Sequence, residues 1–276
     1  MKMKQKFVLI VLTLVLSAAL AACSSKPAST EAEGDGEKAK LKVGISAGVE
    51  EEIWKQVQEV AAKDGLEIEL VVFNDYVQPN KVLAEGELDA NAFQHEPYLD
   101  QFKKDNNLDI VKIANTLNFP IGFYSEKIKE VSEIKEGDVI GLPNDPTNGA
   151  RALILFENAG LIKLKEGVGI KATVRDIAEN KLNLKFEELD AAFIPKALGD
   201  LTAAVINTNY AVEAGFVPTK DAIFIEPKDS PWVNIIAVRT EDKDKPVFQR
   251  LIKAYHSDQV KKFVEEKYGT YIVASW

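Results

Sequence analysis

The chain contains 276 residues, 46% of them hydrophobic, with 43 acidic against 34 basic side chains and a formal net charge of −9. An acidic surface is unfavourable for nucleic acid and for electrostatic attachment to anionic lipid, so we expect neither kind of binding. The net charge sets no limit on the charge of a small ligand, because a ligand site is local.

A secretory signal is predicted over residues 1–22. Three lysines precede an apolar run from Phe7 to Leu20, and two alanines separate that run from Cys23. The run is shorter than the roughly 20 apolar residues of a membrane span, which favours a signal over an N-terminal membrane anchor. Removal of the three lysines would take the net charge from −9 to −12.

Cys23 is a predicted lipidation site. The sequence Leu20-Ala21-Ala22-Cys23 resembles the lipobox of bacterial lipoproteins. That resemblance implies a thioether-linked diacylglyceryl group on Cys23 and cleavage just before it. A multi-chain anchor is needed because one acyl chain holds a protein at a membrane only marginally. Residues 23–40 have no apolar period and are predicted to form a disordered tether on the extracytoplasmic side of the membrane.

Strand and helix signals alternate from residue 41 onward. The first run predicts these elements: strand 41–46, helix 50–63, strand 68–73, helix 80–87, strand 88–93, and extended segments at 110–113 and 120–124. The second run predicts these: strand 139–142, helix 146–159, strands 184–189, 203–206, 222–225 and 234–239, and helices 247–255 and 257–268. Such alternation predicts an α/β fold with parallel-rich sheets and helices on both faces. The two successive runs predict two lobes.

Aromatic side chains gather just beyond predicted strands, where ligands of α/β sheets bind. Tyr76, Phe93, His95 and Tyr98 occupy these positions. They could wall an apolar slot with polar tips, as in small-molecule sites. The alternative is that these aromatic residues pack in the protein core and that the histidine is hydrogen bonded there without a ligand.

A second cluster surrounds the start of the helix predicted at residue 146. Asn144 or Asp145 can cap that helix, and Pro146 suits its first position. Asn148 and Arg151 are three residues apart and share a helix face. A helix N-terminus beside a guanidinium group is a natural carboxylate site. An ordinary cap with a surface arginine is the alternative.

Asn207 and Asn209 follow the buried strand 203–206. Their amides could supply donors and acceptors for the charged ends of an amino acid. The alternative is that they are two loop asparagines without a ligand.

Several long motifs occur in a fixed order: DYVQPN, LDANAFQHEPYL, LPNDPTNGARAL, ENAGLIKLKEG, VINTNYA and SPWVNIIAVR. With them the chain resembles the NlpA/MetQ family of methionine-binding lipoproteins, which are the substrate-binding proteins of ABC importers. The resemblance implies a two-lobed, type II-like periplasmic-binding-protein fold with crossing hinge strands. Lobe I would comprise 41–123 and 229–276, and lobe II would comprise 124–228. It also implies a permease and ATPase complex as partner, and neither a cofactor nor an enzymatic activity.

The resemblance further implies roles for individual residues. Four would wrap the thioether side chain of methionine: Tyr76, Phe93, His95 and Tyr98. Arg151 would bind the ligand carboxylate. Four asparagines would fix the amino and carboxylate groups: Asn148, Asn207, Asn209 and Asn234.

Two segments depart from the family pattern. Many members have Pro-His-Ala-Glu where this chain has Val49 to Glu52, and His-Leu-Glu-Pro or His-Val-Glu-Pro where it has Leu117 to Pro120. A tryptophan beside the first loop, here Trp54, is also similar to what is found in relatives that take methionine-containing dipeptides. We therefore expect either methionine or a slightly larger ligand, such as a dipeptide or another amino acid, in a cleft widened at its amino end.

Two other functional classes have weaker support. Gly44-Ile-Ser-Ala-Gly48 matches the G-x-S-x-G pattern of serine hydrolases, with Ser46 as nucleophile and His256 as a later base. A zinc or manganese carrier would need several ligands, yet the chain has only two histidines and no EF-hand loop. We predict neither a catalytic nor a metal site.

Overall fold

The computed structural model describes residues 38–228 and 230–276, which belong to one compact unit of the chain. The predicted signal sequence, Cys23 and most of the predicted tether lie outside these residues. Among the helices that are described, none is both long enough and apolar enough to cross a membrane.

The first sheet has six strands in the order β13-β4-β12-β3-β1-β2. Their bounds are β1 (Ala39–Ser46), β2 (Leu66–Phe73), β3 (Ala90–Ala92), β4 (Ile110–Asn118), β12 (Val233–Arg239) and β13 (Val273–Ala274). Strand β1 is parallel to β2 and β3, whereas β12 is antiparallel to β3 and β4, and β13 is antiparallel to β4. The sheet is therefore mixed, with parallel pairing in its N-terminal part.

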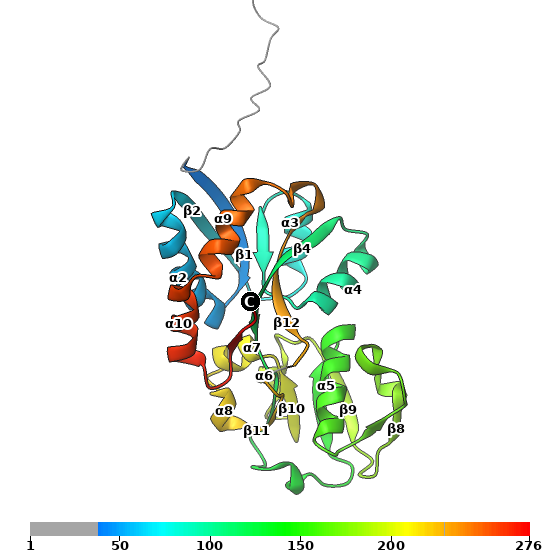
Figure 1. Ribbon diagram of the computed structural model, residues 1–276. Coiled ribbons are helices and arrows are strands. Elements are labelled where there is room, and N and C mark those ends of the chain that lie inside the picture. The colour runs from blue at the N-terminus through cyan, green and yellow to red at the C-terminus, as the bar shows by residue number, and fades with distance from the viewer. Residues whose placement is uncertain (1–37, 229) are drawn as a thin grey trace, which may run out of the picture. The chain divides into compact units, whose positions relative to one another are not determined.

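Helices cover both faces of this sheet (Figure 1). They are α2 (Val49–Lys63), α3 (Gln78–Ala84), α4 (Glu96–Asn106), α9 (Pro246–Tyr255) and α10 (Asp258–Tyr268). Successive side chains of β12 pack on opposite faces of the sheet, because side chains along a strand point to its two sides in turn. Ile236 and Val238 pack into the core under α2, α9 and α10, while Ile235 and Ala237 pack with residues of α3 and α4.

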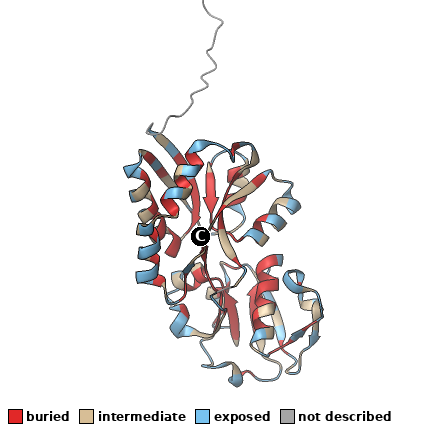
Figure 2. Cartoon of the chain, in the orientation of Figure 1, coloured by how far each residue is buried: buried red, intermediate tan, exposed pale blue. Residues whose placement is uncertain are grey.

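The second sheet has five strands in the order β11-β5-β10-β6-β9. Their bounds are β5 (Gly122–Tyr124), β6 (Val139–Pro143), β9 (Lys185–Leu189), β10 (Ala203–Ile206) and β11 (Ala222–Ile225). Strand β6 is parallel to β9 and β10, while β5 is antiparallel to β10 and β11. Strand β10 is apolar throughout because both of its faces are buried (Figure 2).

The helices of the second lobe are α5 (Pro146–Asn158), α6 (Ile194–Ala197), α7 (Thr208–Glu213) and α8 (Pro218–Asp221). A small two-stranded sheet joins β7 (Lys163–Leu164) to β8 (Ile177–Glu179). Four 3₁₀ turns lie at Val131–Glu133, Gly169–Lys171, Val174–Asp176 and Thr240–Asp242.

The chain passes between the two sheets twice. It leaves the first sheet after Asn118 and enters the second at Gly122, and it returns between Ile225 and Val233. The two-lobed α/β fold is thus confirmed. The expected boundary after residue 123 falls within β5.

Several local predictions need correction. Helix α3 ends at Ala84 rather than at residue 87, strand β3 is limited to Ala90–Ala92, and α6, α7 and α8 were not expected. Helix α4 follows the strand at 88–93 but was not expected, because its apolar face is short and a proline stands at its second position. Strand β1 begins at Ala39, inside the segment predicted as tether, because backbone pairing with Leu66 extends it without needing an apolar pattern.

Candidate ligand-binding site

One cavity gathers all nine residues that the sequence singled out for ligand binding. It encloses about 460 Å³ of space not occupied by protein atoms, counting its open mouth. The fourteen lining residues are Ser46, Glu50, Tyr76, Phe93, Gln94, His95, Tyr98, Phe119, Asn148, Arg151, Asn207, Thr208, Asn209 and Asn234.

Three aromatic rings form one wall of the cavity. The Tyr76 ring centroid lies 5.9 Å from that of Phe93 and 6.1 Å from that of Tyr98, and Phe93 and Tyr98 are also 6.1 Å apart. The Tyr98 hydroxyl donates to the carbonyl of Tyr76 at 2.8 Å, so the polar tip of that ring is already satisfied. The rings therefore present apolar surface to the cavity, as expected of a slot for an uncharged side chain.

His95 is held as a neutral imidazole. It caps α4 by accepting the Tyr98 backbone N–H at Nδ1, 3.1 Å away, which places the ring proton on Nε2. Nε2 then donates to Oδ1 of Asn148 at 3.3 Å. Burial, and secondly the charge of Arg151, lower the pKa of His95 to about 3. The imidazole is therefore uncharged throughout the physiological range and bridges the two lobes.

Asn148 lies in the first turn of α5 and is fixed by its own helix cap. Asp145 accepts the backbone N–H of Asn148 at 2.9 Å with one oxygen and its side-chain amide at 2.9 Å with the other. The remaining Oδ1 of Asn148 accepts from His95 and, at 3.0 Å, from Nδ2 of Asn207. Of the two candidate caps, Asn144 and Asp145, it is Asp145 that caps the helix, and its effect reaches Asn207 through this chain of hydrogen bonds.

Two amide atoms in the cavity wall have no partner among the described residues. Oδ1 of Asn207 and Nδ2 of Asn209 are both buried and both lack a hydrogen bond. The opposite atoms are engaged, because Asn207 donates to Asn148 and Tyr76 donates to Oδ1 of Asn209 at 2.5 Å. Buried polar atoms are nearly always paired, so one acceptor and one donor stand ready for a ligand.

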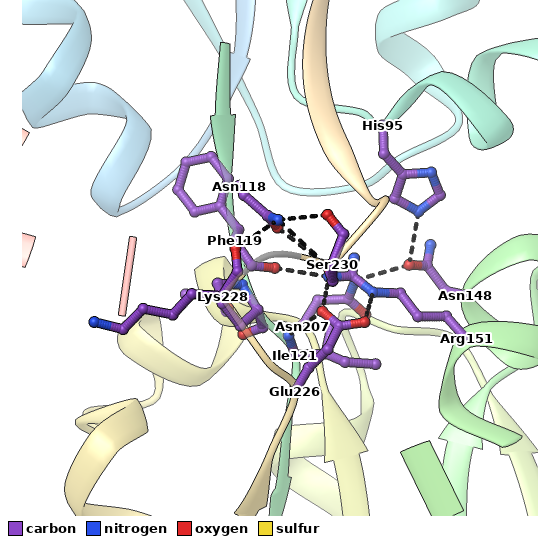
Figure 3. Close-up of polar contacts among 12 residues, drawn as sticks. His95, Asn118, Phe119, Ile121, Asn148, Arg151, Asn207, Glu226, Lys228 and Ser230 are labelled. Atoms are coloured by element: carbon purple, nitrogen blue, oxygen red, sulfur yellow. Dashed lines mark hydrogen bonds and ion pairs between the residues drawn. The ribbon is translucent and has the colours of Figure 1, made fainter. Parts of the chain in front are cut away.

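Arg151 is buried rather than on the surface, and it already has a carboxylate partner. Its Nε donates to Oε1 of Glu226 at 3.0 Å, and its Nη2 donates to Oε2 of Glu226 and, at 2.9 Å, to the carbonyl of Phe119 (Figure 3). The two side chains are 3% and 8% exposed. Nη1 makes no hydrogen bond within the described residues, so this edge of the guanidinium remains for a ligand.

Glu226 was not anticipated from the sequence. It follows β11 directly and lies 75 positions from Arg151, so neither periodicity nor spacing connects the two. Its backbone N–H donates to the carbonyl of Ile121 at 3.0 Å, which joins the two crossing segments. The one feature of the sequence that could have identified Glu226 is its position, as an acidic residue directly after an apolar strand.

Hydrogen bonds between side chains, and from side chains to carbonyls, join the two lobes around the cavity. Besides the His95–Asn148 and Tyr76–Asn209 bonds, the Tyr210 hydroxyl donates to the carbonyl of Asn74 at 3.3 Å. Gly48 lies beside Asn209 of the second lobe. Its φ of 86° favours glycine, and a Cβ there would lie 3.7 Å from the Asn209 carbonyl, which is an ordinary contact distance.

The segments that depart from the family pattern reach the cavity at two residues only. Glu50 and Phe119 line it, whereas Leu117 and Asn118 belong to β4. Trp54 is 1% exposed and packs edge-on against Tyr255, at 5.1 Å between centroids. Neither Leu117 nor Trp54 can widen the cavity directly, because both side chains fill the core of the first lobe.

Ser46 lies in the cavity wall, but His256 does not line it. His256 is hydrogen bonded to the Asn115 carbonyl at 2.8 Å and stacks on Trp276. Among the residues the structure describes, no hydrogen bond joins the Ser46 hydroxyl to an imidazole, and no group of three potential metal ligands is found. The pairing of Ser46 with His256 that a serine hydrolase would require is therefore absent from this part of the chain.

Replacing Asp145 with alanine is expected to weaken both folding and ligand binding. Loss of the α5 cap should lower the free energy of unfolding by about 1–2 kcal/mol, and Asn148 should lose the orientation that it passes to His95 and Asn207. Ser257, whose hydroxyl caps α10, is the matched control. Urea unfolding should show a loss in both alanine variants, while calorimetric titration should show weaker binding only for Asp145→Ala. Equal affinity in the two variants would contradict the orienting role.

Comparison with known proteins agrees with this architecture. The NlpA lipoprotein family model matches residues 41–276. The D-methionine-binding lipoprotein MetQ of Escherichia coli strain K12 is 47% identical over 238 residues, which cover 85% of this chain and 88% of the relative. Outer membrane lipoprotein 3 of Mannheimia haemolytica is 44% identical over 236 residues, covering 85% and 90%.

Solved structures give the same picture. A nutrient binding protein from Burkholderia cenocepacia, bound to methionine, is 50% identical with a TM-score of 0.83, covering 86% of this chain and all of that one. The crystal structure of the methionine binding protein MetQ is 46% identical with a TM-score of 0.83, covering 86% and 98%. Because the family model matches residues 41–276, this chain belongs to the NlpA lipoprotein family.

Proposed function

We propose that this protein is the substrate-binding lipoprotein of an ABC importer and that its cavity captures methionine between the two lobes. The observation that carries the proposal is the composition of the cavity wall. An aromatic slot, an unengaged guanidinium edge and two unpartnered amide atoms line the same space. Relatives with this fold are named for methionine binding, and one was solved with methionine bound.

Each part of methionine has a counterpart in the wall. The α-carboxylate would lie against Nη1 of Arg151, near the N-terminus of α5, where a negative charge is favoured. Nδ2 of Asn209 is a further donor for it. The thioether would lie among Tyr76, Phe93 and Tyr98, where each sulfur–aromatic contact contributes about 0.3–1.5 kcal/mol. Asn234, whose amide donates to the Phe93 carbonyl at 3.3 Å, would border the polar end.

The same proposal places the protein at the membrane. A lipid on Cys23 and the segment after it would hold the folded lobes on the extracytoplasmic side, within reach of a permease and ATPase complex. The relatives are named lipoproteins, which supports the anchor. An intact mass that begins at Cys23 and includes an acyl-glycerol group would establish it.

Binding of methionine to ligand-stripped protein tests the function. The protein is unfolded, dialysed and refolded, and L-methionine, D-methionine and methionine-containing dipeptides are titrated by calorimetry. We expect saturable one-site binding of methionine. Stabilisation by arginine or glutamate, with no response to methionine or its dipeptides, would rule out this ligand while leaving a role in solute capture open.

A further inference from the structure

Glu50 is the only acidic residue among the described residues that line the cavity. It lies in the first turn of α2 with Glu51 and Glu52, but the three carboxylates differ in their surroundings. Glu51 accepts the backbone N–H of Gly48 at 3.0 Å, and Glu52 pairs with Lys267 and Tyr268 at the surface. Glu50 alone is buried, at 6% exposed.

The carboxyl group of Glu50 has only uncharged hydrogen-bond partners within the described residues. Oε2 accepts the Ser46 backbone N–H at 2.9 Å, Nδ2 of Asn234 lies 3.5 Å from Oε1, and the Ser46 side chain is a further partner. No ion pair involves Glu50 within residues 38–228 and 230–276, although buried acids are usually paired. Burial raises the pKa of Glu50 to about 8, so the group is largely protonated at neutral pH in the absence of a ligand.

Within the part of the chain that the structure describes, no cation pairs with this side chain. Arg151 shares the cavity, but its charge is balanced by Glu226, and His95 is neutral. The titratable groups that sense the charge of Glu50 are the phenols of Tyr76 and Tyr255, whose pKa values are raised, first by burial. Neither phenol can become a cation.

Charged groups on the elements packed against α2 are engaged or solvated. Lys40 of β1 is paired with Glu67 and Glu69 of β2 at the surface. Arg250 of α9 contacts Asp64, and Lys267 of α10 contacts Glu52. The other charged side chains of these elements and of α7 are exposed: Lys42, Glu213, Lys253, Asp258, Lys261, Lys262, Glu265 and Glu266.

A second feature of the cavity points to the same kind of ligand group. Oδ1 of Asn207 is an acceptor that lacks a donor, on a side chain that is only 8% exposed. An acid without a cation and an amide oxygen without a donor are both satisfied by one primary ammonium group, which carries a positive charge and three N–H donors.

We propose that Glu50 receives the ammonium group of the bound amino acid and gives up its proton as the ligand enters. The inference rests on the proposed function, because it requires an amino-acid ligand. The O–H bond of the Glu50 carboxyl group breaks, its proton passes to the solvent, and the ligand ammonium keeps all its protons. Binding and proton release are then coupled, and Glu50 selects for a free amino group.

The coupling has a defined direction with pH. Without ligand, the raised pKa favours the protonated acid, so the contribution of Glu50 to stability is complete below its ordinary pKa of 4.5 and is lost as the pH rises through about 8. With ligand, the ionised form is favoured. Affinity should therefore fall as the pH is lowered below 8, by at most about tenfold per pH unit for one linked proton.

Calorimetry of the wild-type protein and Glu50→Gln with L-methionine tests the inference. At pH 6, titrations in phosphate and in imidazole buffers, whose ionisation heats differ, should show close to one proton released per methionine bound by the wild type and none by the variant. At pH 8.5 the variant should bind methionine at least tenfold more weakly. Its ligand-free form should nevertheless melt at a higher temperature than the wild type at that pH, which loss of a merely structural contact would not produce.

Two controls separate the ammonium contact from other effects. Glu51→Gln removes the same charge from the same helical turn and should leave both proton release and affinity unchanged. The desamino analogue 4-(methylthio)butanoate lacks the ammonium, so Glu50→Gln should not weaken its binding. Wild-type binding of methionine without proton release, or equal losses for both ligands in Glu50→Gln, would overturn the inference alone. No binding of either methionine enantiomer to the wild type would instead overturn the proposed function.

Discussion

Replacing Arg151 with alanine is expected to weaken methionine binding by about 2–5 kcal/mol, because a ligand carboxylate in a closed cleft would lose its charged partner. The free energy of unfolding should fall as well, by about 3–5 kcal/mol, since the variant leaves the Glu226 carboxylate buried without its cation. Calorimetric titration and urea unfolding of the same preparation measure the two losses.

A double variant separates these two effects. Arg151→Met combined with Glu226→Gln removes both charges, so most of the stability should return while methionine binding stays weak. Arg151→Lys should also bind weakly, because an ammonium cannot reproduce the fork that holds Glu226, the Phe119 carbonyl and a ligand together. Methionine amide, which has no carboxylate, should lose little affinity in Arg151→Ala. Unchanged methionine affinity in Arg151→Ala would show that the carboxylate binds elsewhere.

The second large expected effect concerns the ligand side chain. Amino acids with charged side chains should be rejected by several kcal/mol relative to methionine, because the rings of Tyr76, Phe93 and Tyr98 offer no counter-charge in a buried slot. Norleucine has nearly the same shape as methionine but lacks sulfur, so it should bind more weakly by about 0.3–1.5 kcal/mol. Competition titrations against L-methionine measure both differences.

Phe93→Leu links this selectivity to the aromatic wall. The variant keeps an apolar side chain but removes one ring, so it should weaken methionine more than norleucine. Phe186→Leu is the control, because Phe186 packs against Phe156 and does not line the cavity. Equal losses for methionine and norleucine in Phe93→Leu would contradict a sulfur–aromatic contribution.

Local signals in the sequence were sufficient for the fold and for most of the cavity wall. Apolar residues spaced as in strands alternate with apolar residues spaced as in helices, and this alternation predicted two α/β runs. Many of these apolar residues form the buried cores of the structure. The cap at Asp145 and the spacing of Asn148 and Arg151 depend on helix geometry alone, so they were readable without a tertiary structure. The resemblance to the family added Asn234, and all nine residues that the sequence singled out line one cavity.

Other features were decided by packing between distant segments. Nothing in the run Glu50-Glu51-Glu52 says which carboxylate turns inward, because that depends on how α2 lies against β1 and the second lobe. The Arg151–Glu226 pair joins residues 75 positions apart, and the hydrogen bond from Tyr76 to Asn209 spans 133. The sequence alone therefore singled out nine of the fourteen residues that line the cavity. Their partners, charge states and remaining free atoms followed only from the tertiary structure, because burial and long-range contacts determine which polar groups are already satisfied.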